Sequence, residues 1–258
     1  MRQRPGRSLL AGRARPLAGG LLAGCVLFVA VFGIVVAGQS TAGRVDRAVD
    51  TPLLVWFTSH PALALWMAYP ATLVPAGAVS LIAALACLAR GWLRGAVLAL
   101  LAVPVASGLN DALLKPLFHR TYGGALTYPS GHTSAIAALA SALTVLLLLA
   151  PRRSPAPLPV PPPAPAPRPA PRPALAAALR WAIPAVAWLA VVVVAIGVIG
   201  LRWHYFTDIL GGTALGTGSV CALVLLLDIS WPRRGRGPGP VQLAPGRNRA
   251  SPGRGHPG

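Results

Sequence analysis

A run of 21 residues without a charged side chain, residues 17–37, limits what this chain can fold into more than any other feature. A helix of that length crosses about 30 Å of hydrocarbon at roughly 1.5 Å per residue. Five arginines precede it within residues 1–16, and no clean Ala-x-Ala cleavage site follows it. We therefore interpret the run as an uncleaved membrane-spanning helix rather than a signal peptide.

Five more apolar runs predict an all-α, polytopic membrane protein with six transmembrane helices. The chain is 55% hydrophobic, only 11% charged and has a mean hydropathy of +0.63, which excludes a single soluble domain. Residues 39–60 carry four charged side chains before Trp56 and Phe57, so they predict a short interfacial segment. The spans expected after the first are residues 63–88, 95–114, 133–150, 181–201 and 209–227.

Arginine is concentrated in four segments that six spans would leave on one side of the cell membrane. These segments, residues 1–16, 89–94, 151–180 and 231–258, hold 18 of the 23 basic residues. By the positive-inside rule this side, with both termini, is cytoplasmic. The pattern also accounts for the net charge of +18 without a nucleic-acid partner, because the arginines flank apolar runs instead of forming a basic stripe. Two unusual stretches, residues 115–132 and 202–208, then share the extracytoplasmic face.

The sequence predicts a basic cytoplasmic N-terminus at residues 1–16, a membrane domain at 17–228 and a disordered basic cytoplasmic tail at 229–258. Within the membrane domain, 12 of the 23 residues at 151–173 are proline, which favours an extended cytoplasmic linker. A partner of the SH3 or WW kind is the alternative for this loop. The cysteines lie in apolar runs without metal-ligand spacing and are interpreted as core residues.

Lys115 is the single lysine of the chain, and Arg120 follows five residues later. Lysine is a point charge and arginine a bidentate fork for phosphate oxygens. Asp111 precedes Lys115 by four residues and could orient it across one helical turn. The alternative is that both basic side chains reach toward lipid headgroups from a helix end.

The segment Pro129-Ser130-Gly131-His132 runs directly into the fourth apolar run. Ser130 is a suitable N-cap, Gly131 permits close approach of a ligand to the backbone, and the free N–H groups of a first helical turn attract anions. A capped helix without a ligand is the simpler reading. It leaves unexplained His132, a titratable group standing where it could protonate a leaving oxygen.

His204 and Asp208 are four residues apart and therefore share one helix face. A carboxylate that holds one imidazole nitrogen leaves the other free as a nucleophile. Such a pair alone is more often a satisfied polar contact. Its convergence with Lys115 and His132 on one membrane face favours phosphoryl transfer to histidine.

These residues resemble the type 2 phosphatidic acid phosphatase (PAP2) family, which shares its core with the vanadium haloperoxidases. The family's second motif, Pro-Ser-Gly-His, is complete at residues 129–132, and its third motif is represented by His204 and Asp208. An upstream lysine, Lys115, stands for the first motif, and six spans match the membrane members. The resemblance covers about residues 105–216.

The resemblance implies the roles of the site residues. His204 would be the nucleophile that becomes phosphohistidine, Asp208 would orient it, and His132 would protonate the leaving group. The phosphoryl oxygens would be held by Lys115, Arg120, Ser130 and the Gly131 N–H. The resemblance implies no metal or other cofactor.

Two positions depart from the family pattern. Tyr122 stands where the first motif has its second arginine, and Val198 stands where the third motif has its arginine. We predict that Arg202, two residues before His204, turns inward to supply the missing charge.

The leading hypothesis is therefore a metal-independent phosphatase that acts on a lipid phosphate or diphosphate at the extracytoplasmic membrane face. Phosphatidate, phosphatidylglycerophosphate and undecaprenyl diphosphate are the substrates that the resemblance allows. The alternative is a catalytically degenerate member acting as a transporter or scaffold, although few polar residues lie in mid-span. Haloperoxidase chemistry is disfavoured by the six spans. Gly212 and Gly216 predict close packing against another span of the same chain.

Overall fold

The long apolar segments fold as helices, as the sequence predicts. The computed structural model describes residues 8–11, 13–150 and 174–230. Its six helical segments long and apolar enough to cross a membrane are Ala14–Val36, Pro61–Ala89, Leu93–Phe118, Gly131–Leu149, Ala177–Gly200 and Phe206–Ser230. The predictions for residues 1–7, for the proline-rich linker at 151–173 and for the tail from 231 onward lie outside the described residues.

The elements follow one another along the chain with short connections. The helices are α1 (Ala14–Val36), α2 (Arg44–Phe57), α3 (Pro61–Ala68), α4 (Leu73–Ala89), α5 (Leu93–Leu109), α6 (Lys115–Phe118), α7 (Gly131–Thr144), α8 (Ala174–Gly200) and α9 (Phe206–Ser230). Three tighter or wider turns extend them: η1 (Tyr69–Ala71), η2 (Asn110–Leu114) and η3 (Val145–Leu149). A two-residue hairpin, β1 (Thr121–Tyr122) with β2 (Ala125–Leu126), precedes α7.

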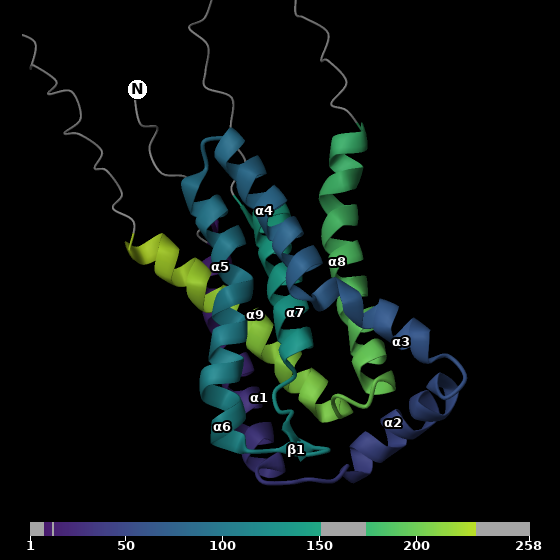
Figure 1. The fold of residues 1–258 in the computed structure, drawn as a ribbon. Coiled ribbons are helices and arrows are strands. Elements are labelled where there is room, and N and C mark those ends of the chain that lie inside the picture. Colours follow the sequence, from purple (N-terminus) through teal and green to yellow (C-terminus); the bar gives the residue numbers. More distant parts are fainter. Residues whose placement is uncertain (1–7, 12, 151–173, 231–258) are drawn as a thin grey trace, which may run out of the picture.

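Helix α7 occupies the centre of the bundle, with α5, α8 and α9 packed around it (Figure 1). Its span is 72% buried, more than any other described span. The reason lies in its sequence, where alanine and serine recur between the leucines and allow neighbouring helices to approach closely. Helix α1 packs on the outside of α9, and α3 packs against α8.

The closest helix pair is α7 with α9, and glycines on α9 make it possible. A Cβ atom on Gly212 would collide with the carbonyl oxygen of Ser130, and one on Gly216 would collide with that of Ser134. The prediction that this pair packs within the chain is thus confirmed. It brings the N-terminal ends of α7 and α9 side by side.

The second span is not one straight helix. Its chain turns at η1, where Pro70 cannot donate a backbone hydrogen bond, and α3 and α4 leave this turn in different directions (Figure 1). Helix α4 runs along α5, whereas α3 diverges toward α8. The sequence analysis expected an unbroken span at residues 63–88.

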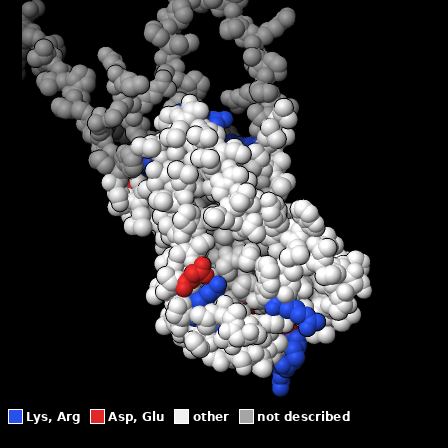
Figure 2. Space-filling model, viewed as in Figure 1, with Lys and Arg blue, Asp and Glu red and all other residues white. Residues whose placement is uncertain are grey.

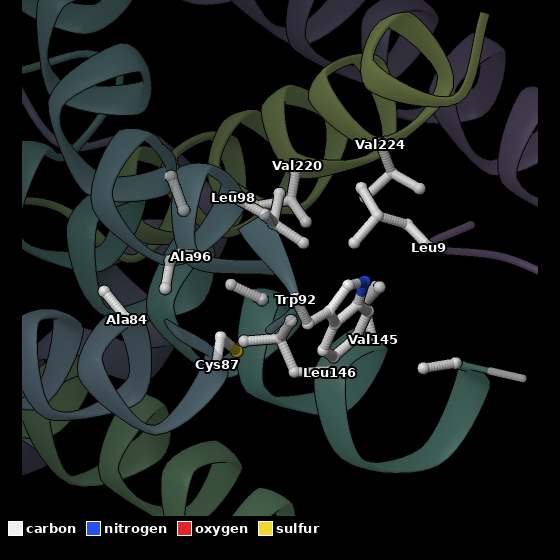
Figure 3. Close-up of a cluster of buried hydrophobic side chains, with 14 of the residues drawn as sticks. Leu9, Ala84, Cys87, Trp92, Ala96, Leu98, Val145, Leu146, Val220 and Val224 are labelled. Atoms are coloured by element: carbon white, nitrogen blue, oxygen red, sulfur yellow. The ribbon is translucent and has the colours of Figure 1, made fainter. Parts of the chain in front are cut away.

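At the end of the bundle that the sequence predicts to be cytoplasmic, a buried cluster joins the chain's start to its last helix. Trp92 is 4% exposed and lies among apolar side chains of α5, η3 and α9, with Leu9 beside Val224 (Figure 3). The Asp228 carboxylate accepts hydrogen bonds from the backbone N–H groups of Leu9 at 2.8 Å and Leu10 at 3.2 Å. It also pairs with Arg94 at 3.3 Å and Arg15 at 3.5 Å.

The outward faces of the helices are apolar. Large hydrophobic side chains such as Leu17, Ile34, Leu73 and Val74 are each more than 70% exposed. Figure 2 shows one such face, white along most of its length, with charged side chains toward its two ends. A soluble protein rarely exposes so large an apolar surface, so this is a membrane protein.

Helix α2, α6 and the hairpin gather at the end opposite the α4–α5 turn (Figure 1). Helix α2 begins with Gly43, whose N–H donates to the Asp46 carboxylate at 3.0 Å. Asp46 and Asp50 are 1% and 5% exposed, so both face inward. The segment at residues 39–60, expected as an interfacial element, is thus a helix that covers this end of the bundle.

Candidate active site

Two helix starts form the centre of the candidate active site. The Ser130 N–H before α7 donates to the carbonyl oxygen of Asp208 on α9 at 2.9 Å. Tyr128 is fully buried and its hydroxyl donates to the Val29 carbonyl of α1 at 3.0 Å, which holds the entry into α7. As a result His132 and His204, 72 residues apart in sequence, have ring centroids only 6.2 Å apart.

The start of α7 carries Ser130, Gly131 and His132. Ser130 caps the helix, because its Oγ accepts a hydrogen bond from the Thr133 N–H at 3.4 Å. The cap prediction is therefore confirmed, but Ser130 is 0% exposed and does not line the cavity described below. Gly131 and His132 do line it, and the His132 ring lies 5.2 Å from that of Trp203.

Lys115 reaches the site from the last turn of the third span. Its Nζ lies 2.9 Å from Oδ1 of Asp111, which also accepts a hydrogen bond from Asn110 Nδ2 at 3.0 Å. The expected orientation of Lys115 by Asp111 is thus confirmed. The wide turn η2 sits at this point, as such turns often do at functional sites. A Cβ on Gly131 would lie 3.7 Å from Nζ, so the lysine faces the start of α7.

Arg120 lies elsewhere than the sequence analysis expected. Its Nη1 donates to Oδ1 of Asp208 and Oγ1 of Thr207, and its Nη2 donates to Oδ2 of Asp46, each at 2.6 Å. The guanidinium is 0% exposed, stacks over the Tyr205 ring and does not line the cavity. Two buried carboxylates take its donors, because buried charges require partners. Arg120 is thus placed behind the histidine–aspartate pair rather than at a phosphate.

His204 and Asp208 lie on one face at the start of α9, as their spacing predicts. Nδ1 of His204 is 3.8 Å from Oδ2 of Asp208, which is longer than a hydrogen bond. Oδ2 accepts the Tyr205 N–H at 2.9 Å instead. The structure brings the pair together but leaves Nδ1 of His204 buried without a partner among the described residues.

The positions that depart from the family pattern have different surroundings. Tyr122 lines the cavity, with its ring 4.5 Å from that of Tyr205. Val198 is fully buried in the core of α8, so that position cannot supply a charge. Arg202 is exposed and lines the cavity from a left-handed backbone conformation at φ 58°. Its replacement role for the missing arginines stays a prediction.

A cavity of about 740 Å³ connects these side chains. One end is polar, and its wall includes Asp111, Lys115, Tyr122, His132, Arg202 and His204. The cavity continues between α4 and α5 along apolar or small side chains, including Leu73, Ala76, Gly77, Leu100, Val103 and Pro104. It therefore combines a charged head region with an apolar extension inside the predicted membrane span.

The sequence analysis missed Asp46 and Asp50 as parts of this region. Besides Arg120, Asp46 binds the Thr207 N–H at 2.9 Å and the Thr207 hydroxyl at 2.8 Å through Oδ1. Asp50 accepts the Phe206 N–H at 3.4 Å. Their spacing of four residues on an amphipathic segment was a signal that both would face inward.

Burial affects the two acids in opposite ways. Burial raises the pKa of Asp46, but hydrogen bonds from Thr207, Gly43 and Arg120 outweigh it and hold that pKa below its ordinary value. For Asp50, burial together with the negative charges of Asp46 and Asp208 raises the pKa to about 7. Asp50 therefore titrates near neutral pH within reach of the site.

Comparison with known proteins adds one match. A family model described as the PAP2 superfamily matches residues 55–231, more than half of the chain. The match includes every predicted site residue and excludes Asp46 and Asp50. No curated protein and no solved structure gives a significant match.

Proposed function

The chain belongs to the PAP2 superfamily, which supports a phosphatase-type hydrolase acting on phosphate esters, and we propose that its substrate is a lipid phosphate or diphosphate. The observation that carries the proposal is the single cavity in which Lys115, His132 and His204 meet and which then continues between α4 and α5. A phosphate would occupy the charged end while its hydrocarbon tail lies along the apolar wall.

The reaction begins at His204. Its free ring nitrogen attacks phosphorus, and the bond from phosphorus to the leaving oxygen breaks as the phosphohistidine forms. His132 donates a proton to that oxygen, which leaves as an alcohol or, from a diphosphate, as the shorter phosphate. In the second step His132 takes a proton from water, the water oxygen attacks phosphorus, and the nitrogen–phosphorus bond breaks to release phosphate.

Positive charge and N–H groups at the cavity stabilise the transition state. Lys115 supplies a fixed charge, and the Gly131 N–H opens α7, where the helix dipole favours an anion. Arg202 adds the charge that Tyr122 and Val198 do not supply. Loss of one such donor typically costs about 10²- to 10³-fold in rate. This set acts without a metal ion or other cofactor.

The apolar part of the cavity favours a substrate that stays in the membrane. Its walls belong to two predicted spans, so a tail placed there remains at hydrocarbon depth. By the distribution of arginines, the site lies at the extracytoplasmic face of the cell membrane and both termini are cytoplasmic. Phosphatidate and undecaprenyl diphosphate represent the diacyl and polyprenyl classes.

The test is phosphate release by the full chain in detergent, with EDTA present throughout. Substrates are phosphatidate, undecaprenyl diphosphate and the soluble monoester p-nitrophenyl phosphate. We expect release from a lipid to exceed release from the soluble ester and to disappear in His204→Ala. His119→Asn is the matched control, because His119 is exposed, does not line the cavity and has a left-handed conformation that asparagine tolerates.

The second candidate function is a catalytically degenerate membrane protein that acts as a transporter or scaffold. Tyr122 and Val198, which replace two expected arginines, favour it. Folded protein that releases phosphate from none of the three substrates would support this candidate and contradict the phosphatase. Release that stops with EDTA would contradict the metal-free mechanism.

A further inference from the structure

The His204 side chain stands between two cavities. One is the large cavity of the candidate active site, and the other is a small cavity of about 120 Å³ on the side of α2. Tyr122 and His204 line both. A ring nitrogen can therefore face the substrate while the rest of the ring borders the small cavity.

The nitrogen without a partner is Nδ1 of His204. It is buried, and the nearest expected acceptor, Oδ2 of Asp208, lies 3.8 Å away and already accepts the Tyr205 N–H. The other oxygen of Asp208 binds Arg120 at 2.6 Å. A buried N–H without an acceptor costs roughly 1–3 kcal/mol, so this nitrogen calls for a further acceptor.

The small cavity contains a second buried atom without a partner, Oδ1 of Asp50. Asp50 is 5% exposed, and its Oδ2 accepts the N–H of Phe206 at 3.4 Å. This bond holds the carboxylate beside the start of α9, two residues after His204. Arg47 and Thr51 also line the cavity, so its walls are polar enough for water.

We propose that Asp50 is a positioning residue for His204, connected to Nδ1 through water in the small cavity. A water molecule occupies about 30 Å³ and needs two or more polar partners, and both conditions are met there. The inference rests on the proposed function in that it assigns His204 as the nucleophile. It adds a carboxylate that lies before the family match at residues 55–231.

The chemical effect follows from the tautomer. An acceptor at Nδ1 keeps the proton on that nitrogen and leaves Nε2 unprotonated, so that Nε2 can attack phosphorus. The same carboxylate offsets the positive charge that the ring gains when Nε2 binds the phosphoryl group. Asp208 contributes from behind, held in place by Arg120, so the histidine has acidic groups on two sides.

The group must be ionised to act, which predicts a pH dependence. Burial and the charges of neighbouring acids raise the pKa of Asp50 to about 7, so the active carboxylate form increases as pH rises through neutrality. The charged and titratable groups around it come from four elements and their connections. They are Asp46 and Arg47 on α2, Arg120 before the hairpin, Tyr122 on β1, His204 and Tyr205 before α9, and Asp208 on α9.

The experiment compares Asp50→Asn, Asp50→Glu and Arg44→Gln with the wild type, using phosphatidate in detergent micelles from pH 5 to 9. Asn retains an oxygen for the Phe206 N–H but removes the charge. We expect kcat to fall about 10- to 100-fold, as for other partners that orient a reacting group indirectly, with KM within about twofold. The rise of kcat near pH 7 should disappear in Asp50→Asn and persist in Asp50→Glu. Arg44 is exposed on the same helix and serves as the charge control.

A second measurement needs no turnover. The chain has five histidines, so nitrogen NMR of histidine-labelled protein can report the His204 tautomer, assigned by its loss in His204→Gln. We expect the proton on Nδ1 in the wild type and a mixed tautomer in Asp50→Asn. An unchanged tautomer together with an unchanged pH profile would overturn the inference. A wild type without activity whose tautomer still depends on Asp50 would overturn the proposed function and leave the positioning role supported.

Discussion

Replacing Arg120 with alanine should destabilise this protein strongly, because it would leave two buried acids without their cation. Asp46 and Asp208 are 1% and 0% exposed, and each receives a 2.6 Å hydrogen bond from the guanidinium. Breaking a buried ion pair from one side costs about 3–5 kcal/mol. For a chain of this size that corresponds to a fall of roughly 6–20 °C in unfolding midpoint.

Lys115→Ala is the matched comparison. The Lys115 side chain is 21% exposed and its partner Asp111 is 61% exposed, so that pair contributes only about 0–1 kcal/mol. We therefore expect Lys115→Ala to keep the midpoint and lose activity, whereas Arg120→Ala lowers the midpoint first. The assay is thermal unfolding in detergent, followed by phosphate release at a temperature where both variants are folded.

A double variant makes the test sharper. Asp46→Asn with Arg120→Met removes one negative and one positive charge together, so its loss of stability should be smaller than the sum of the two single losses. An Arg120→Ala protein with a wild-type midpoint and a raised KM would refute the reasoning. It would return Arg120 to the phosphate-binding role that the sequence analysis assigned.

Three further predictions concern other parts of the chain. Because the pKa of Asp50 is raised to about 7, its charged form costs stability as pH rises from about 4 through 7, so Asp50→Asn should raise the unfolding midpoint more at pH 8 than at pH 5; an equal change at both pH values would contradict this. Arg202→Ala should lower kcat/KM for phosphatidate about 10²-fold with little change in midpoint, and full activity would show that Arg202 does not replace the missing arginines. Gly216→Ala should cost about 1–3 kcal/mol by overpacking α7, whereas Gly20→Ala, with no atom near its Cβ, should be neutral or stabilising by about 0.5–1 kcal/mol; equal midpoints would contradict the packing account.

The spans were predictable because their signal is local. An uncharged run such as residues 17–37 has few alternatives to a membrane-spanning helix, and Gly212 and Gly216 announced a close contact by their spacing alone. The break at η1 was also marked, by Pro70, but a proline inside an apolar run indicates a kink without giving its direction.

Several features of the site were not predictable because they depend on pairings distant in sequence. Arg120 binds carboxylates 74 residues before it and 88 residues after it, and no local pattern distinguishes such a partner from a phosphate. Asp46 and Asp50 were visible as charges on an interfacial segment. Only the fold shows that this helix covers the start of α9 and turns both acids inward.

The measurement that tests the central claim most directly is trapping of the phosphorylated protein. The chain is mixed with phosphatidate carrying ³²P in its phosphate, quenched in alkali within milliseconds to seconds, and separated from lipid. The account predicts label on His204 that is stable in alkali and lost in mild acid, and no label in His204→Ala. Phosphate release by His204→Ala at the wild-type rate, or label on another residue, would contradict it.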